Sequence, residues 1–164
     1  MLRDKSLIPL SHQHQHALAV CVRIERAAPI AAGDLAAWQT EIAQLFQNEI
    51  DVHFSAEEHT VFPAAARFEE LQGLVTQLAA EHSDLRRRFA QAKAGAISSY
   101  EVLALAQCLS NHIRKEERQL FERMQQLLSN DELKALGGSL QAALKGAQQS
   151  CVLPSEATRL RPGK

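Results

Sequence analysis

The feature that most constrains the fold is a repeated pair of polar residues within long helical stretches: His53-x-x-x-Glu57 and His112-x-x-x-Glu116. A gap of four residues places the two side chains of each pair on one face of an α-helix, one turn apart. Both side chains of a pair can therefore reach a common point. Several helices that each aim such groups at a shared interior would form a metal cage.

The rest of the sequence favours helices throughout. Alanine, leucine, glutamine and glutamate are abundant, and all four are good helix formers. No segment shows the alternating apolar pattern of a strand flanked by turn residues. The sequence therefore predicts an all-α protein.

The positions of glycine, proline and capping residues, among them Ser98-Ser99 and Ser129, divide the chain into five expected helices. They cover about residues 9–28, 34–61, 69–94, 98–128 and 133–148. Pro63 is expected to end or kink the second helix, and Gly137-Gly138 to weaken or bend the fifth. Four long helices with short connections predict an antiparallel up-down-up-down four-helix bundle with a short additional C-terminal helix. We expect one domain over residues 1–149 and a flexible C-terminal tail over residues 150–164.

Polar side chains at core positions are the strongest sign of a site. Histidine and glutamate are rarely buried without a partner, because desolvating an unpaired carboxylate costs several kcal/mol. Metal ions supply the missing partner, since they bind carboxylates and neutral imidazoles. Histidines that only hydrogen-bond to one another would leave the two glutamates unexplained. The candidate metal ligands are those on the core-facing seams of the four long helices: His14, His53, Glu57, His82, His112 and Glu116.

The neighbours of these residues are expected to face elsewhere. His12 and His16 lie two residues from His14, and positions two apart differ by about 200° around a helix. We therefore expect them to face solvent. Glu58 and Glu117 are each rotated by about 100° from the preceding glutamate, which argues against their being direct ligands.

Charge and cysteine content exclude several other classes of protein. The 18 basic and 19 acidic residues are mixed along the chain, so no basic stripe indicates nucleic-acid binding. No apolar run reaches the roughly 18 residues of a membrane span, and the N-terminus lacks the apolar stretch of a secretory signal. Three cysteines in no paired pattern argue against a disulfide framework. We expect a cytoplasmic protein with no membrane or nucleic-acid partner.

The order of these motifs resembles the haemerythrin-like, HHE cation-binding family of four-helix bundles over about residues 8–125. The matching pieces are Leu10-Ser11-x-x-His14, His53-x-x-x-Glu57-Glu58 leading to Val61-Phe62-Pro63, Glu81-His82-x-x-Leu85, and His112-x-x-x-Glu116-Glu117 leading to Leu120-Phe121. The resemblance implies a non-haem di-iron centre. In it, Glu57 and Glu116 would bridge two iron ions, and the four histidines would be terminal nitrogen ligands.

The chain also departs from the oxygen-carrying members of that family. Those have a fifth histidine one turn after the ligand of the third helix, where this chain has Arg86, and an aspartate five residues after the last histidine. Here the last carboxylate, Glu116, follows its histidine by four residues. The departure implies a more open centre, suited to reaction with peroxide, nitric oxide or oxygen, or to holding and sensing iron. Arg86 either faces solvent or pairs with Glu81 or Glu101.

Three functions remain open at this point. The leading one is a di-iron protein for oxygen, peroxide or iron handling, with metal ions and small diatomic or peroxide molecules as its partners. It includes a peroxide- or oxygen-reactive activity but assigns no side chain as a catalytic acid, base or nucleophile. The second is a metal- or redox-responsive module that acts on a protein partner. The third is a structural site for zinc or another divalent ion, since these ligand types do not discriminate between iron and zinc.

Overall fold

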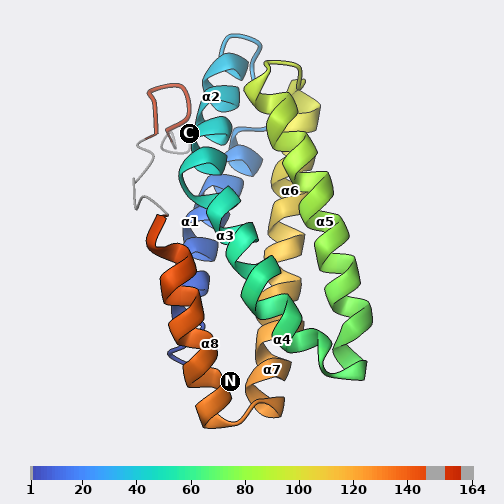
Figure 1. Cartoon of the computed structure of the whole chain (residues 1–164). Helices are drawn as coiled ribbons and strands as arrows, with labels where there is room; N and C mark the ends of the chain where they lie inside the picture. Colours follow the sequence, from blue (N-terminus) through green and yellow to red (C-terminus); the bar gives the residue numbers. More distant parts are fainter. Residues whose placement is uncertain (1, 147–153, 160–164) are drawn as a thin grey trace.

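The computed structural model describes residues 2–146 and 154–159, whose regular structure is entirely helical. Four rods lie alongside one another and a further helix packs against them (Figure 1). The first rod is α1 (Ile8–Ala27) and the third is α5 (Glu69–Lys93). The second rod consists of α2 (Leu35–Leu45), η1 (Phe46–Ile50), α3 (Asp51–Ala56), η2 (Glu57–Val61) and α4 (Phe62–Ala66). The fourth rod consists of α6 (Ser99–Lys115), η3 (Glu116–Phe121) and α7 (Glu122–Leu127), and the further helix is α8 (Asn130–Ala143), followed by η4 (Leu144–Gly146). The all-helical fold class is thus confirmed, and the arrangement is consistent with a helical bundle.

Local signals in the sequence explain where several helices begin and end. The side chains of Ser98 and Ser129 each accept a hydrogen bond from the backbone N–H three residues later. In turn, the carboxylates of Glu101 and Glu132 accept a hydrogen bond from the backbone N–H of the capping serine. Such reciprocal caps satisfy N–H groups that a helix leaves without partners. After α5, Gly95 has a φ of 68°, a left-handed conformation that glycine adopts without a Cβ penalty. The capping serines that the sequence indicated are therefore used.

The second rod differs from its sequence prediction, because Pro63 does not end it at Val61. The rod continues to Ala66, with Pro63 as the second residue of α4, directly after a wider helical turn. The turn before it, η2, is π-helical and has a hydrogen-bonding pattern one residue wider than that of an α-helix.

The fifth helix also begins earlier than predicted, at Asn130, and its α-helical part ends at Ala143. The last two residues of the predicted range, 147 and 148, lie outside the described residues. Gly137-Gly138 does not interrupt the helix. A Cβ at Gly137 would lie 2.8 Å from the Cβ of Ser6, so this glycine permits a close approach between α8 and the N-terminal turn.

The buried apolar residues form two clusters separated along the rods. The α2-end cluster contains Trp38, Phe54 and Phe89, together with buried residues from the C-terminal parts of α1 and α5 and from α6. The α8-end cluster contains Leu7, Phe121 and the apolar face of α8. In each rod, the buried residues among the six predicted ligands lie at or next to the junction between the two clusters. A polar layer therefore divides the interior.

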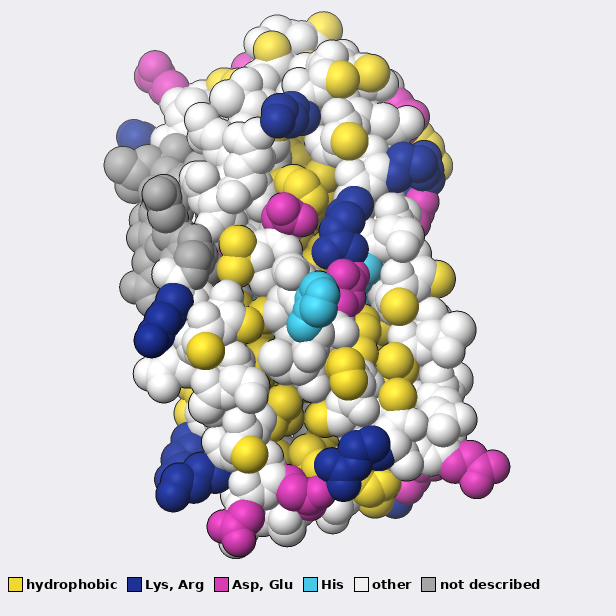
Figure 2. All heavy atoms as spheres, in the orientation of Figure 1, with side chains coloured by type: hydrophobic (Ala, Val, Ile, Leu, Met, Phe, Trp, Pro, Cys, Tyr) yellow, Lys and Arg dark blue, Asp and Glu magenta, His cyan; other side chains and the backbone are white. Residues whose placement is uncertain are grey.

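Part of the predicted tail packs against the rods. Thr158 is buried, and its carbonyl oxygen accepts a 2.9 Å hydrogen bond from Arg23. The other residues of the predicted tail, 150–153 and 160–164, lie outside the described residues. On the face drawn in Figure 2, basic and acidic side chains are interspersed. Within the described part of the chain, every helix is too short or too polar to cross a membrane.

Candidate metal centre

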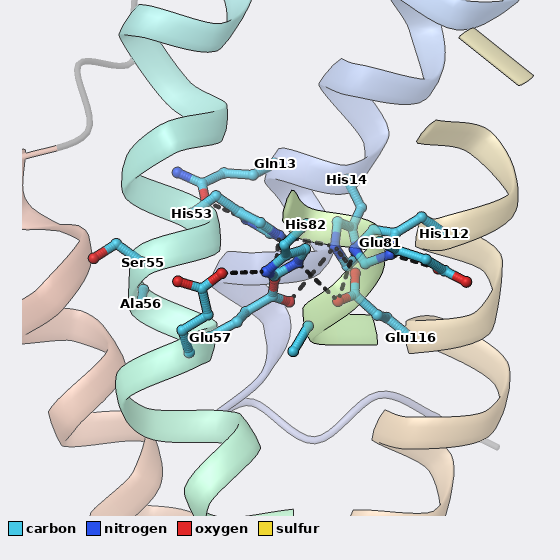
Figure 3. Close-up of polar contacts among 12 residues, drawn as sticks. Gln13, His14, His53, Ser55, Ala56, Glu57, Glu81, His82, His112 and Glu116 are labelled. Atoms are coloured by element: carbon cyan, nitrogen blue, oxygen red, sulfur yellow. Dashed lines mark hydrogen bonds and ion pairs between the residues drawn. The ribbon is translucent and has the colours of Figure 1, made fainter. Parts of the chain in front are cut away.

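The structure brings all six predicted ligand residues together in the polar layer. They project from four rods toward one point, His14 from α1, His53 from α3, Glu57 from η2, His82 from α5, His112 from α6 and Glu116 from η3 (Figure 3). None of them exposes more than 3% of its surface, and Glu57, His82 and Glu116 are fully buried. Four imidazoles and two carboxylates thus share an interior that is shielded from bulk solvent.

Each of the two glutamates begins a π-helical segment, a feature that the sequence reasoning missed. In η2 the N–H of Phe62 donates to the carbonyl oxygen of Glu57, five residues earlier. Phe62 stacks on His82 with ring centroids 5.1 Å apart, and Phe121, five residues after Glu116, stacks on His14 at 5.7 Å. The wider turns therefore place a phenyl ring against the polar layer on the same face as each carboxylate. π-helical turns within α-helices are frequent at functional sites.

The six side chains form two overlapping groups that share both carboxylates. The first group is His14, His53, Glu57 and Glu116, and the second is Glu57, His82, His112 and Glu116. In each group, one candidate ligand atom per residue lies within 4.8 Å of all the others. We call the two the His14–His53 position and the His82–His112 position. Two neighbouring cations bridged by the shared carboxylates would fit this arrangement.

All four imidazoles present Nε2 to the carboxylates. The Nε2 of His112 and of His14 lie 3.1 Å and 3.2 Å from Glu116 oxygens. The Nε2 of His53 and of His82 lie 3.3 Å and 3.4 Å from Glu57 Oε2. Adjacent ligands of an octahedral ion with bonds of about 2.1 Å are about 3.0 Å apart. The donor atoms are therefore spaced as ligands of a common ion would be.

The hydrogen-bonding state of these atoms provides a test of fit. Both oxygens of Glu57, both oxygens of Glu116 and the Nε2 atoms of His82 and His112 are buried without a hydrogen-bond partner among the described residues. Unsatisfied buried polar atoms are rare and costly. The Nε2 atoms of His14 and His53 lie 3.0 Å apart, a separation that fits either a hydrogen bond between them or ligation of one ion by both. The residues therefore fit a centre of bound cations.

The electrostatics of the layer point the same way. Burial by itself lowers the pKa of His14, but the neighbouring carboxylates of Glu116 and Glu117 outweigh it and raise the pKa to about 9. Burial likewise opposes the charged form of His112, whose pKa is nevertheless raised to about 10 by Glu116 and Glu81. The pKa of Glu116 is lowered well below its ordinary value, because the histidines around it outweigh the opposing effect of burial. The two carboxylates thus give the layer a strong preference for positive charge.

A second ring of side chains holds the outward nitrogen, Nδ1, of each imidazole. The partner is a carboxylate oxygen for three of them and an amide oxygen for the fourth. The contacts are His14 to Glu117 (2.7 Å), His82 to Glu58 (2.9 Å), His112 to Glu81 (3.0 Å) and His53 to Gln13 (2.8 Å). A carboxylate only accepts, so each of these three imidazoles holds a proton on Nδ1, and in its neutral form its Nε2 lone pair would point inward.

Reasoning from the sequence assigned no role in the site to Gln13 or Glu81, and it treated Glu58 and Glu117 only as unsuitable direct ligands. The rotation of about 100° that argued against direct ligation is the rotation that brings a glutamate to the outer nitrogen of a neighbouring helix's histidine. A second acidic residue after each motif, as in Glu57-Glu58 and Glu116-Glu117, was the available signal.

Arg86 takes neither of the two partners considered from the sequence. It lies 2.6 Å and 3.1 Å from the two oxygens of Glu58, and 3.7 Å from Asp51. Its guanidinium also lies over the Phe54 ring, 5.4 Å from the centroid. His12 and His16 are exposed as predicted, and His16 lies 3.3 Å from Glu49.

Fold and site together define a helical protein with a buried cluster of histidines and glutamates that could hold metal cations. A family model described as "Hemerythrin HHE cation binding domain" matches residues 9–124. The chain therefore belongs to the haemerythrin HHE cation-binding family. Neither the curated proteins nor the solved structures contain a significant match to it.

Proposed function

We propose that this protein holds two iron ions in the polar layer, bridged by Glu57 and Glu116, and uses them in oxygen, peroxide or iron handling. His14 and His53 would ligate one ion, and His82 and His112 the other. Iron bound there would supply one-electron redox chemistry. The proposal keeps the predicted antiparallel up-down-up-down order of the rods, a single domain over 1–149 and a cytoplasmic location.

One observation carries the proposal: the buried, unpartnered oxygens of Glu57 and Glu116 lie among four inward Nε2 atoms. Family membership supports cation binding as such. The choice of iron rests on the family resemblance and on the mixed imidazole and carboxylate ligand set, which suits iron but also zinc.

The chain's own residues would hold the ligands and shield the centre. The outer carboxylates fix the tautomer and orientation of three imidazoles and increase their strength as donors. Phe54 stacks on His82 with centroids 3.8 Å apart, and Phe62 and Phe121 cover the layer from the α8 end. No side chain is assigned a role as acid or base. The histidines would hold the metal rather than transfer protons.

Metal analysis tests the proposal directly. Full-length protein, made metal-free and then reconstituted with ferrous iron, should contain two iron ions per chain, one for each group of ligands. His53→Ala and His112→Ala should lose iron and also lower the melting temperature of the loaded protein, because binding to a folded site stabilises it. His59→Ala, at an exposed histidine of η2, is the control and should retain both ions. Unchanged iron content in His53→Ala and His112→Ala would refute the ligand assignment, and preferential loading with zinc would favour a structural site.

A second candidate function is a metal-responsive module, favoured by the position of α8. This helix packs against α3 and η2, the segments that carry His53 and Glu57. A change of geometry at the centre would reach α8 directly. Limited proteolysis beyond residue 129, with and without iron, tests this function, and identical cleavage would weaken it.

A further inference from the structure

The two cation positions differ in what supports their imidazoles from outside. At the His82–His112 position, both outer nitrogens contact a carboxylate, Glu58 and Glu81. At the His14–His53 position, one contacts the carboxylate of Glu117 and the other the neutral amide of Gln13. The sequence motifs of the two halves are alike, so this asymmetry lies entirely in the surrounding residues.

Each of the three outer carboxylates is held in its ionised form by a cation. Arg86 binds Glu58, Lys115 binds Glu81, and Arg3 lies 2.5 Å from Glu117. Ser11 donates a further 2.7 Å hydrogen bond to Glu117. Ionised acceptors make charge-assisted hydrogen bonds that are stronger than those of neutral amides. The imidazole backed by Gln13 is thus the weakest-supported of the four.

A carboxylate behind a ligating histidine raises the basicity of that histidine and fixes its orientation, whereas an amide supplies orientation without the charge. Packing adds to the difference. His82 lies between the rings of Phe54 and Phe62, with centroid distances of 3.8 Å and 5.1 Å. A ligand held between two rings is already oriented before an ion arrives. Charge and rigidity therefore both favour tighter cation binding at the His82–His112 position.

We propose that the two positions fill in order, the His82–His112 position first and more tightly, and that Gln13 is the positioning residue that keeps the His14–His53 position the more exchangeable one. This inference rests on the proposed metal binding. It assigns the labile ion to a particular half of the centre.

Titration of the metal-free, full-length protein with Co²⁺, in competition with a chelator, tests the inference. Two binding steps should be resolved, with dissociation constants about 10- to 100-fold apart, which is the range by which outer partners alter metal affinity. We call the ratio of these two constants the gap. Glu58→Gln should weaken the tighter step and narrow the gap, and Glu81→Gln should act in the same direction. Glu117→Gln should weaken the looser step and widen the gap. Gln13→Glu should tighten the looser step and narrow the gap.

A purely structural role of these residues would weaken both steps together and leave their ratio unchanged. Glu70→Gln is the matched control, because Glu70 forms an exposed ion pair with Arg123 away from the centre; it should leave both constants unchanged. Two equal steps in the wild-type protein, or gap changes opposite in sign to those above, would overturn the inference while leaving metal binding intact. Failure of the wild-type protein to bind Co²⁺ would overturn the proposed function as well.

Discussion

The two apolar clusters on either side of the polar layer are closed in different ways. The α2-end cluster is filled by side chains of the long rods and of the short loops that join them, and α8 contributes nothing to it. The α8-end cluster depends on chain outside the rods: Leu7 from the N-terminal turn and Leu133, Leu136 and Leu140 from α8. One half of the interior is therefore closed largely by the rods, whereas the other half needs an additional helix.

The largest expected effect concerns the α2-end cluster. Phe89 is 1% exposed and stacks on Phe46 with centroids 4.7 Å apart, so Phe89→Ala should lower the free energy of unfolding by about 3–5 kcal/mol. Leu140→Ala, at a fully buried position on α8, should lower it by less, because α8 can detach while the rods remain packed. Urea unfolding followed by circular dichroism measures both. Equal losses would show that α8 unfolds together with the rods.

The contact between α8 and the N-terminal turn provides the next test. Gly137→Ala places a methyl group 2.8 Å from the Cβ and 3.1 Å from the Cα of Ser6. Overpacking of this kind costs about 1–3 kcal/mol, more than the ~1 kcal/mol gained by removing a glycine from a helix. Gly138→Ala, whose added Cβ would meet open space among the described residues outside its own helix turn, should instead stabilise the protein by about 1 kcal/mol. Thermal melts of both variants test this prediction. A change in melting temperature of the same sign in the two variants would contradict it.

The two capping boxes allow the same change to be made in each half. Ser98→Ala at α6 and Ser129→Ala at α8 each remove a cap worth about 1 kcal/mol. Amide hydrogen exchange should show loss of protection throughout the rods for Ser98→Ala, but mainly within α8 for Ser129→Ala. Uniform loss of protection in both variants would show that the two halves open as one.

The smallest expected effect is the pH dependence of the α8 cap. Hydrogen bonds from the backbone N–H of Ser129, from Arg67 and from the Ser129 hydroxyl lower the pKa of Glu132 from 4.5 to about 2. Because the pKa is lower in the folded state, the ionised group stabilises the protein above pH 4.5, and this stabilisation is lost as the pH falls from 4.5 to about 2. The difference in melting temperature between wild type and Glu132→Gln should shrink across this window. A constant difference from pH 5 to pH 2 would contradict the assignment.

The sequence predicted those features of the fold that depend on local pattern. The helical class, the serine caps and the core-facing side of His14 follow from three- and four-residue spacing and from capping chemistry. The same spacing placed His53, Glu57, His112 and Glu116 on core-facing seams, and the structure brings them together. Their role as ligands remains a prediction.

Features that depend on contacts between distant segments were not accessible from the sequence. The partner of Arg86 is set by how the second rod packs against α5, which brings Glu58 rather than Glu81 or Glu101 to it. The role of Gln13 depends on the approach of α1 to α3, 40 residues away in sequence. Gly137 looked like a weak point in a helix, and only the position of Ser6 shows why a small residue is needed there.

The wide turns that begin at Glu57 and Glu116 require that each glutamate be followed by its phenylalanine after five residues. Each turn brings an aromatic ring, five positions after the glutamate, against a histidine of the polar layer: Phe62 stacks on His82 and Phe121 on His14. Deleting one residue between carboxylate and ring would restore the ordinary helical repeat and rotate everything that follows by about 100°. Insertions and deletions in these two stretches would therefore displace Phe62 and Phe121 from the polar layer.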